Sequence, residues 1–176
     1  MLNSDNCIVL MIDMQEKLVQ ATNAEQEVSK AKKLIKTAEI LNIPTLVSEQ
    51  YPKGLGSTVN CLKNEKQRYF EKTSFSILKE ENFSEILKSY NKTQIILFGI
   101  EAHICVYQTA IDLLKQGYEV YLVKDTCKSR HEYEFNTGIE LMKQEDIKIT
   151  CLEIVLFELL KTSKNPHFKE IQYLIK

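Results

Sequence analysis

The sequence predicts an α/β fold, in which a mainly parallel, six-stranded sheet lies between two layers of helices as a three-layer αβα sandwich. Short unbroken apolar runs alternate along the chain with stretches whose apolar residues recur at helical spacing. Apolar runs without polar alternation fit strands that are buried on both faces. Strands that alternate with helices imply right-handed crossovers and a parallel sheet. The length of 176 residues fits a single domain over residues 1–176.

Six segments predict strands, and the first of them is the clearest. Residues 7–12 read Cys-Ile-Val-Leu-Met-Ile and end at Asp13. The other predicted strands cover residues 44–47, 68–71, 94–98, 120–123 and 147–152. Helical periodicity predicts helices over residues 27–41, 82–90, 104–116, 134–144, 155–160 and 167–175. Residues 48–66 contain Pro52, Gly54 and Gly56 and are expected to form a loop.

The charge balance and the cysteines restrict the class of protein. The 23 basic and 24 acidic residues are dispersed and give a net charge of −1, which argues against a nucleic-acid or anionic-membrane partner. The N-terminal apolar stretch is too short for a signal peptide, and no run approaches the ~20 residues that a membrane span needs. Five cysteines without a Cys-x-x-Cys pair argue against a disulfide framework and predict a reducing, cytoplasmic location.

Polar residues follow the predicted strands at the edge where parallel sheets bind their ligands. The acid Asp13 follows the first strand, Lys72 follows the third, and Cys105 comes shortly after the fourth. We therefore expect an acid, a base and a thiol to meet at one edge of the sheet.

Cys105 is the strongest candidate nucleophile because it lies in the first turn of a predicted helix. The helix dipole and the free backbone N–H groups there favour a thiolate and could stabilise an oxyanion. Asp13 could accept the thiol proton or hold a cation, and Lys72 could stabilise the thiolate or the oxyanion. The alternatives are a buried core thiol, a structural carboxylate at a strand end and a surface lysine.

Three segments resemble the signature segments of the isochorismatase-like (cysteine hydrolase) superfamily. They are Asp13-Met14-Gln15, residues 71–76 (Glu-Lys-Thr-Ser-Phe-Ser) and residues 99–106 (Gly-Ile-Glu-Ala-His-Ile-Cys-Val). Residues 48–56 resemble the branch of isochorismatase domain-containing proteins of unassigned substrate, and the likeness extends to residues 165–169. The resemblance implies the Rossmann-like fold of these hydrolases.

The resemblance also implies a catalytic triad of Asp13, Lys72 and Cys105. It implies a cis peptide bond between Ile100 and Glu101, and an oxyanion hole made by the backbone N–H groups of Glu101 and Cys105. In the implied reaction Asp13 is the general base, Cys105 attacks a carbonyl, and water then releases the acid from a thioester. The expected substrate is a small molecule with an amide or a related C–N or ester-like bond. Isochorismatase itself cleaves a vinyl ether, so the family name leaves the bond open.

No metal or other cofactor is expected. Nicotinamidases of the superfamily carry an Asp-x-His element after the second strand, whereas residues 48–51 here contain no histidine. The histidines His103, His131 and His167 do not have the spacing of metal ligands. We therefore predict no catalytic zinc, and nicotinamide is disfavoured as a substrate.

Five residues are candidates for the substrate pocket, and each has a simpler interpretation. A turn before Pro52 explains the polar run that precedes it equally well, and a histidine near the cysteine could equally face solvent. The five candidates are Gln15, Glu49, Gln50, Tyr51 and His103. We expect Cys7, Cys61, Cys127 and Cys151 to be structural, and Asp125 to pair with Arg130 after the fifth strand.

A second hypothesis is a non-catalytic ligand-binding or oligomeric interaction protein with a vestigial triad. The apolar residues Phe168, Tyr173 and Leu174 near the C-terminus could pack against a partner subunit or against their own domain. A homo-oligomer is also what the family resemblance implies.

Overall fold

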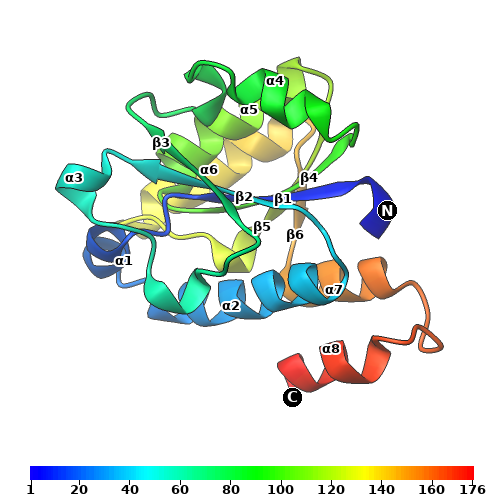
Figure 1. Ribbon diagram of the computed structural model, residues 1–176. Coiled ribbons are helices and arrows are strands. Elements are labelled where there is room, and N and C mark those ends of the chain that lie inside the picture. The colour runs from blue at the N-terminus through cyan, green and yellow to red at the C-terminus, as the bar shows by residue number, and fades with distance from the viewer.

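Six parallel strands form the central sheet of the computed structural model, which describes all residues 1–176 (Figure 1). The strand order is β3-β2-β1-β4-β5-β6, and each neighbouring pair is parallel. The strands are β1 (Cys7–Ile12), β2 (Thr45–Gln50), β3 (Arg68–Lys72), β4 (Gln94–Gly99), β5 (Glu119–Val123) and β6 (Lys148–Thr150). The predicted six-stranded α/β fold is confirmed.

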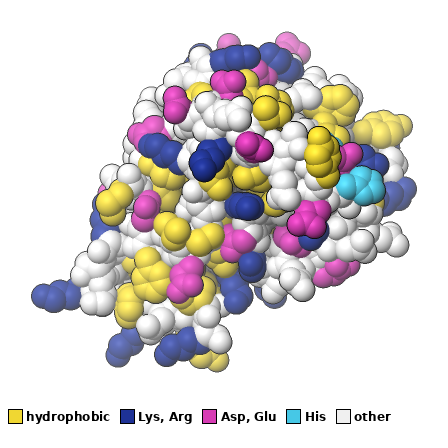
Figure 2. Space-filling model, turned by 180° about the vertical axis from the view of Figure 1, so that it is seen from behind, with side chains coloured by type: hydrophobic (Ala, Val, Ile, Leu, Met, Phe, Trp, Pro, Cys, Tyr) yellow, Lys and Arg dark blue, Asp and Glu magenta, His cyan; other side chains and the backbone are white.

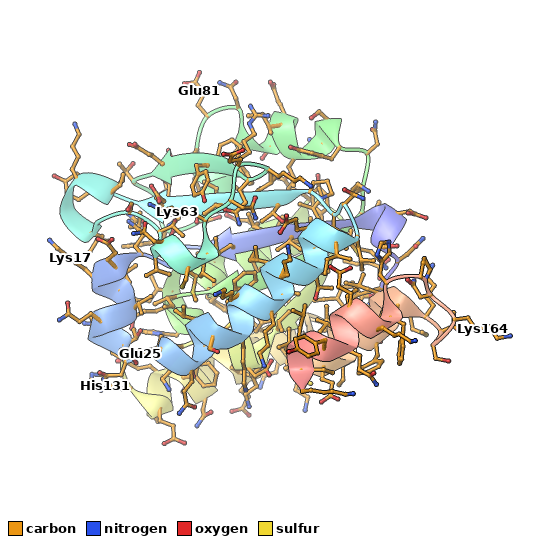
Figure 3. The ribbon with its side chains drawn as sticks, turned by 60° about the horizontal axis from the view of Figure 1, so that its bottom comes forward. Lys17, Glu25, Lys63, Glu81, His131 and Lys164 are labelled. Atoms are coloured by element: carbon orange, nitrogen blue, oxygen red, sulfur yellow. The ribbon has the colours of Figure 1, made fainter.

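Helices cover both faces of this sheet. They are α1 (Glu16–Thr22), α2 (Glu25–Ile40), α3 (Pro52–Leu55), α4 (Phe83–Ser89), α5 (Tyr107–Lys115), α6 (Glu132–Gln144), α7 (Leu152–Leu160) and α8 (Phe168–Ile175). In Figure 1, α4, α5 and α6 lie on one side of the sheet, and α2 and α7 lie on the other. The C-terminal α8 packs outside this layer, alongside α2 (Figure 3). No helix has both the length and the apolar character that crossing a membrane requires.

The two central strands explain the unbroken apolar runs of the sequence. Every residue of β1 and β4 is buried, because helices cover both faces of the sheet at its centre. The strands pair from Cys7 opposite Gln94 to Ile12 opposite Gly99. Gly99 has a φ of +139°, and a Cβ there would collide with the carbonyl oxygen of Ile12. Glycine is therefore required where β4 leaves the sheet.

The structure corrects the expected boundaries at two strands. Residues 48–50 were expected in a loop, but they continue β2, because Ser48 and Gln50 pair with Phe70 and Lys72 of β3. The last strand was expected over residues 147–152, but β6 is shorter because it pairs with β5 at only three positions. Leu152 instead begins α7.

Two short helices were not expected from the sequence. The helix α1 buries only Val19 and Thr22, so its sequence lacks an apolar stripe. The helix α3 is a single turn after Tyr51, inside the segment that was expected to be a loop.

Candidate active site at the carboxyl edge of the sheet

The structure brings Asp13, Lys72 and Cys105 together at the carboxyl edge of the sheet. Asp13 directly follows β1 with a φ of 50°, and Lys72 is the last residue of β3. Cys105 lies in a widened helical turn over Ala102–Val106 that leads into α5. All three residues are buried, so their charges and protons are shielded from water.

The Asp13 carboxylate uses its two oxygens differently. Its Oδ1 accepts a hydrogen bond of 2.7 Å from Ser48 Oγ. Its Oδ2 lies 2.7 Å from Lys72 Nζ, the distance of a charge-assisted hydrogen bond. Burial raises the pKa of Asp13 above its ordinary value, although Lys72 acts in the opposite direction. The carboxylate is therefore a stronger base than one in water.

The Lys72 ammonium is held by three neutral oxygens besides its ion pair with Asp13. They are Gln50 Oε1 at 2.5 Å, Phe75 O at 3.0 Å and Ser74 O at 3.2 Å. These contacts replace the water that the buried ammonium loses. They fix the position of the charge beside the carboxylate.

Glu80 secures the loop that supplies two of those oxygens. Its Oε1 accepts hydrogen bonds from the backbone N–H groups of Thr73 (3.0 Å) and Ser74 (2.9 Å). Burial acts to raise the pKa of Glu80, but these two hydrogen bonds outweigh it and hold the pKa below its usual value. Sequence reasoning missed Glu80, because nothing local indicates that it reaches back to this loop.

Cys105 carries a protonated thiol at neutral pH. Burial, followed by the nearby Asp13 carboxylate, raises the pKa of Cys105 to about 12, although Lys72 acts to lower it. The helix-terminus argument predicted a thiolate, and the desolvation of the thiol overrides it. An attack by this thiol on a carbonyl therefore needs a base that takes its proton, and Asp13 is close enough to influence the thiol.

The loop before Cys105 has the expected backbone geometry. The Ile100–Glu101 peptide bond is cis, as the family resemblance implied. The backbone N–H of Glu101 donates no hydrogen bond within the chain. This N–H is therefore available to an oxyanion.

Arg130 holds this loop through the Glu101 carboxylate. Glu101 Oε2 accepts hydrogen bonds from the Arg130 backbone N–H (2.9 Å) and Nε (3.1 Å). The predicted Asp125–Arg130 pair is wrong. Asp125 instead pairs with Lys30 at 3.2 Å, because the end of β5 faces α2 rather than the segment that follows.

Gln15 and Gln50, two of the candidate pocket residues, are bonded to each other. Gln15 is fully buried. Its Oε1 accepts from the Gln50 backbone N–H at 2.7 Å, and its Nε2 donates to the carbonyl oxygens of Gln50 (3.0 Å) and Gly56 (2.6 Å). Gln15 thus extends the pairing of β1 with β2 beyond Asp13, and Gln50 turns its side chain toward Lys72.

The side chains of the other three candidates form no hydrogen bond with the three central residues, although the Tyr51 backbone N–H donates to the Lys72 carbonyl at 2.9 Å. Glu49 accepts hydrogen bonds from the N–H (2.6 Å) and the hydroxyl (2.7 Å) of Thr58, and Tyr51 is exposed. His103 Nδ1 lies 2.9 Å from Ser129 Oγ, which holds the ring against the loop before α6. These contacts account for Glu49 and His103 structurally.

The remaining cysteines are free thiols in different environments. Cys7 and Cys127 are buried, Cys151 is partly buried and Cys61 is exposed. Burial raises the pKa of Cys7 to about 11 and that of Cys127 to about 12. Cys61 is not a core thiol, because its short helical turn lies on the surface.

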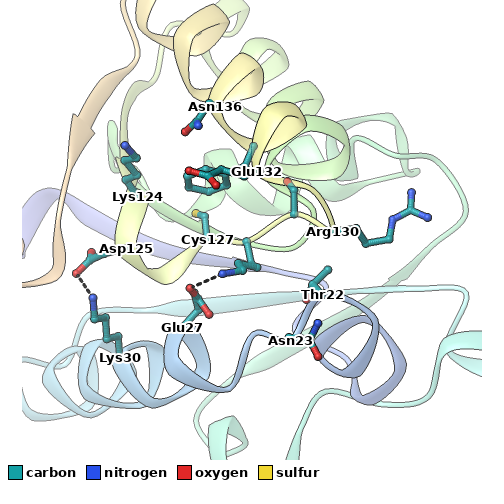
Figure 4. A pocket seen from close by; sticks show the side chains of 13 residues that line it. Thr22, Asn23, Glu27, Lys30, Lys124, Asp125, Cys127, Arg130, Glu132 and Asn136 are labelled. Atoms are coloured by element: carbon teal, nitrogen blue, oxygen red, sulfur yellow. Dashed lines mark hydrogen bonds and ion pairs between the residues drawn. The ribbon is translucent and has the colours of Figure 1, made fainter.

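A cavity of about 620 Å³ opens at the same edge of the sheet, beside the loop after β5 (Figure 4). Two ion pairs join α2 to this loop across it: Lys30 with Asp125 at 3.2 Å, and Lys128 with Glu27 at 3.4 Å. The Lys128 carbonyl also accepts from the Ala102 backbone N–H at 2.9 Å, so the cavity wall is bonded to the turn that carries Cys105. No local pattern in the sequence indicates these long-range pairs.

Charge elsewhere on the surface is mixed. On the face seen in Figure 2, basic and acidic side chains are interspersed. The chain contains no group of three or more His, Cys, Asp or Glu side chains arranged to hold a metal ion.

Comparison with known proteins places these features in a family. Residues 7–154 match the Isochorismatase domain. The chain is 40% identical to isochorismatase domain-containing protein 2 from Danio rerio over 178 aligned residues, which cover 99% of this chain and 89% of that protein. Among solved structures, the MAR1 ribonuclease from Caenorhabditis elegans has a TM-score of 0.93 and 38% identity, over 99% of this chain and 91% of that one.

A more distant structure shares the fold alone. The YcaC gene product from Escherichia coli, described as an octameric hydrolase of unknown specificity, has a TM-score of 0.90 at 21% identity over 99% of this chain and 94% of that one. The family match covers most of the chain, and the fold agrees with it from end to end. This chain belongs to the isochorismatase-domain family.

Proposed function

We propose that this protein is a cysteine hydrolase that cleaves a small amide, or a related C–N or ester-like bond, through a thioester on Cys105. Membership of the isochorismatase-domain family supports a hydrolase activity. The observation that carries the proposal is the buried Asp13–Lys72 pair beside the protonated thiol of Cys105, which is within hydrogen-bonding reach of the Asp13 carboxylate.

The first half of the reaction forms the thioester. Cys105 Sγ attacks the substrate carbonyl while its proton passes to Asp13 Oδ2, and the carbonyl oxygen becomes an oxyanion. The intermediate then collapses. The C–N or C–O bond breaks, and the proton on Asp13 passes to the departing nitrogen or oxygen.

The second half consumes one water. Asp13 takes a proton from the water, whose oxygen attacks the thioester carbonyl. The C–S bond breaks, the carboxylic acid leaves, and the proton returns to Cys105. Lys72 keeps its charge throughout and stabilises Asp13 in its ionised form, while the free Glu101 N–H donates to each oxyanion.

Trapping the acyl-enzyme tests this proposal without knowledge of the natural substrate. The protein is incubated with a panel of small activated amides and esters, quenched in acid and analysed by intact and peptide mass spectrometry. We expect an acyl adduct on Cys105 that hydroxylamine removes, as a thioester requires. Cys105→Ala should abolish adduct and turnover, whereas Cys61→Ala, which removes the exposed thiol, should leave both unchanged.

A failure to form the adduct would favour the non-catalytic alternative. If wild-type protein forms no adduct and turns over no member of the panel, the triad is vestigial and the chain is a ligand-binding or interaction protein. Turnover that survives Cys105→Ala would also exclude the thioester.

A second candidate is the hydrolysis of RNA, which the similarity to a protein described as a ribonuclease favours. A groove of about 460 Å³ beside α2 offers a place for phosphates, because Lys32, Lys33, Lys36 and Lys63 line it. Incubation with a labelled RNA oligonucleotide tests this function. If Cys105→Ala still cleaves the RNA, the ribonuclease activity belongs to a site other than Cys105.

We also propose a homo-oligomer that works in the reducing cytoplasm. Ile154, Phe157 and Tyr173 of α7 and α8 are exposed apolar side chains that a second subunit could cover, and all five cysteines are free. Sedimentation of the protein at micromolar concentration tests the oligomer, and a monomer would overturn it.

A further inference from the structure

A groove of about 460 Å³ lies beside α2 and has no part in the candidate active site. One wall is α2, and the others are the short turn that carries Cys61 and the C-terminal helix α8, which lies alongside α2 (Figure 3). None of Asp13, Lys72 and Cys105 lines it. The groove is therefore separate from the site of the proposed hydrolysis.

Lysines dominate the charged lining of this groove. Four of them face a single acidic residue, Glu39, which is itself paired with Lys36 at 3.1 Å. Lys32 and Lys33 form no ion pair with a carboxylate of the chain, and Lys63 Nζ donates only to the Ser57 hydroxyl, at 2.9 Å. These three positive charges lack an internal counter-ion in a chain whose net charge is −1. The groove is therefore suited to an anion.

Much of the remaining lining is apolar. Ile35 and Leu62 are buried side chains beneath the groove, and Leu174 of α8 is partly buried beside them. Tyr173, also of α8, is 79% exposed, so most of its ring is uncovered. An aromatic ring of this kind offers a stacking face to a flat ligand. The groove thus combines a site for an anion with a site for an apolar ring.

We infer that this groove binds a mononucleotide, with its phosphate on Lys32, Lys33 and Lys63 and its base against Tyr173. A phosphate ester supplies the negative charge that these lysines lack, and ammonium groups are common phosphate donors. A nucleobase supplies the flat ring, and every base can stack on an aromatic side chain. The volume lies within the range of pockets that hold small molecules. Binding changes no covalent bond, and it does not depend on Cys105.

The extent of the lysine cluster favours a single nucleotide over an RNA strand. The stretch from Lys32 to Lys36 covers about one turn of α2, or about 6 Å along its axis. Proteins that hold single strands do so with a continuous basic groove that follows ~4–16 nucleotides. A cluster one turn long is matched to one or two phosphates. The free nucleotide is therefore the ligand that we expect here.

Cys61 reports on occupancy of the groove, because its exposed thiol lines it. The full-length protein is treated with iodoacetamide in the presence of AMP, GMP, CMP or UMP. Peptide mass spectrometry gives the alkylation rate of Cys61 relative to that of the partly buried Cys151. At about 5 mM ligand, a site with a Kd of about 1 mM is about five-sixths occupied, so we expect at least one nucleotide to slow Cys61 about sixfold. Added salt should reverse the protection, because the lysines hold the phosphate electrostatically.

Lys32→Gln/Lys33→Gln should remove the protection while keeping helix-forming residues on α2. The matched control is Lys88→Gln/Lys115→Gln, which removes the same charge from α4 and α5 on the other side of the sheet (Figure 1). Tyr173→Ala should weaken the protection, and sedimentation of this variant checks that its oligomeric state is unchanged. Inorganic phosphate and the free nucleoside, each of which carries only part of the ligand, should protect less than the nucleotide.

Several results would overturn the inference. It fails if no nucleotide slows Cys61, or if the control variant loses the protection as fully as Lys32→Gln/Lys33→Gln. Inorganic phosphate that protects as well as a nucleotide would mean an anion site without a place for a base, which also contradicts it. If only an RNA oligonucleotide protects Cys61, the groove serves the candidate RNA function instead. None of these results bears on the thioester, because trapping at Cys105 tests that separately.

Discussion

Lys72 Nζ and Asp13 Oδ2 form an ion pair of 2.7 Å in which neither side chain has any exposure to solvent. A buried pair of this kind costs desolvation energy, and its two members depend on each other. Removal of one member leaves an uncompensated buried charge. The pair therefore has a testable signature in stability as well as in catalysis.

We predict that Lys72→Met lowers the free energy of unfolding by about 3–5 kcal/mol, because it leaves the Asp13 charge unpaired. The double variant Asp13→Asn/Lys72→Met should regain a large part of this loss, because neither charge remains. Urea unfolding at pH 7 measures both. If the double variant is no more stable than Lys72→Met, the unpaired Asp13 charge is not the cause of the lost stability.

Glu80 should stabilise the loop after β3 only while it is ionised. Because its pKa in the folded protein lies below the usual value, the stabilisation is present above the ordinary glutamate pKa and is lost as the pH falls through the folded value. Glu80→Gln should therefore lower the melting temperature at pH 7, with a difference that shrinks at acid pH. The neighbouring Glu81→Gln is the matched control, because Glu81 points away from the loop at the molecular edge (Figure 3). Equal effects of the two variants would contradict the anchoring role.

The buried thiols should weaken the protein at alkaline pH. The folded-state pKa of Cys127 is raised to about 12, so its contribution to stability is complete below the pKa of an unfolded cysteine and is lost as the pH rises toward the folded value. Between about pH 9 and pH 11 one such thiol contributes a slope of up to about 1.4 kcal/mol per pH unit. Cys127→Ala should be less stable at pH 7 but lose stability less steeply over this range. If the unfolding free energies of wild type and Cys127→Ala change in parallel with pH, Cys127 does not titrate with a raised pKa in the folded protein.

Arg130 should affect the reactive loop more than the stability of the fold. Its guanidinium is half exposed, and its contacts are confined to Glu101 beside the cis peptide bond. We expect Arg130→Ala to lower the yield of acyl adduct on Cys105 severalfold, with less than about 1 kcal/mol lost in unfolding free energy. Arg68→Ala removes the other arginine, which lies over the ring of Phe70 on β3, and should leave the adduct unchanged. If Arg130→Ala leaves the adduct yield unchanged, the contact between Arg130 and Glu101 has no role in the reaction.

The sequence predicts what depends on local pattern. Short strand-like segments located all six strands, and the order of elements located the edge where Asp13, Lys72 and Cys105 meet. The sequence could not predict features that depend on residues distant in the chain but adjacent in the fold. Gln50 belongs to a strand only because β3 lies beside it, and Arg130 pairs with Glu101 rather than with Asp125 because of how two distant loops meet. The protonated state of Cys105 also depends on burial, which the position of a residue at a helix start does not reveal.

The strand order divides the site between two halves of the chain. Strands β1 to β3 supply the Asp13–Lys72 pair, and β4 to β6 follow on the other side of one seam, where Ile12 faces Gly99. The nucleophile thus comes from a separate half, whose sheet strands meet those of the charge pair only where β1 pairs with β4. A side chain at position 99 would collide with the carbonyl oxygen of Ile12, which directly precedes Asp13, so the close approach at this seam helps to set the spacing between thiol and base. The distance between the thiol and its base therefore depends on how the two halves of the chain pack together, and neither half determines it alone.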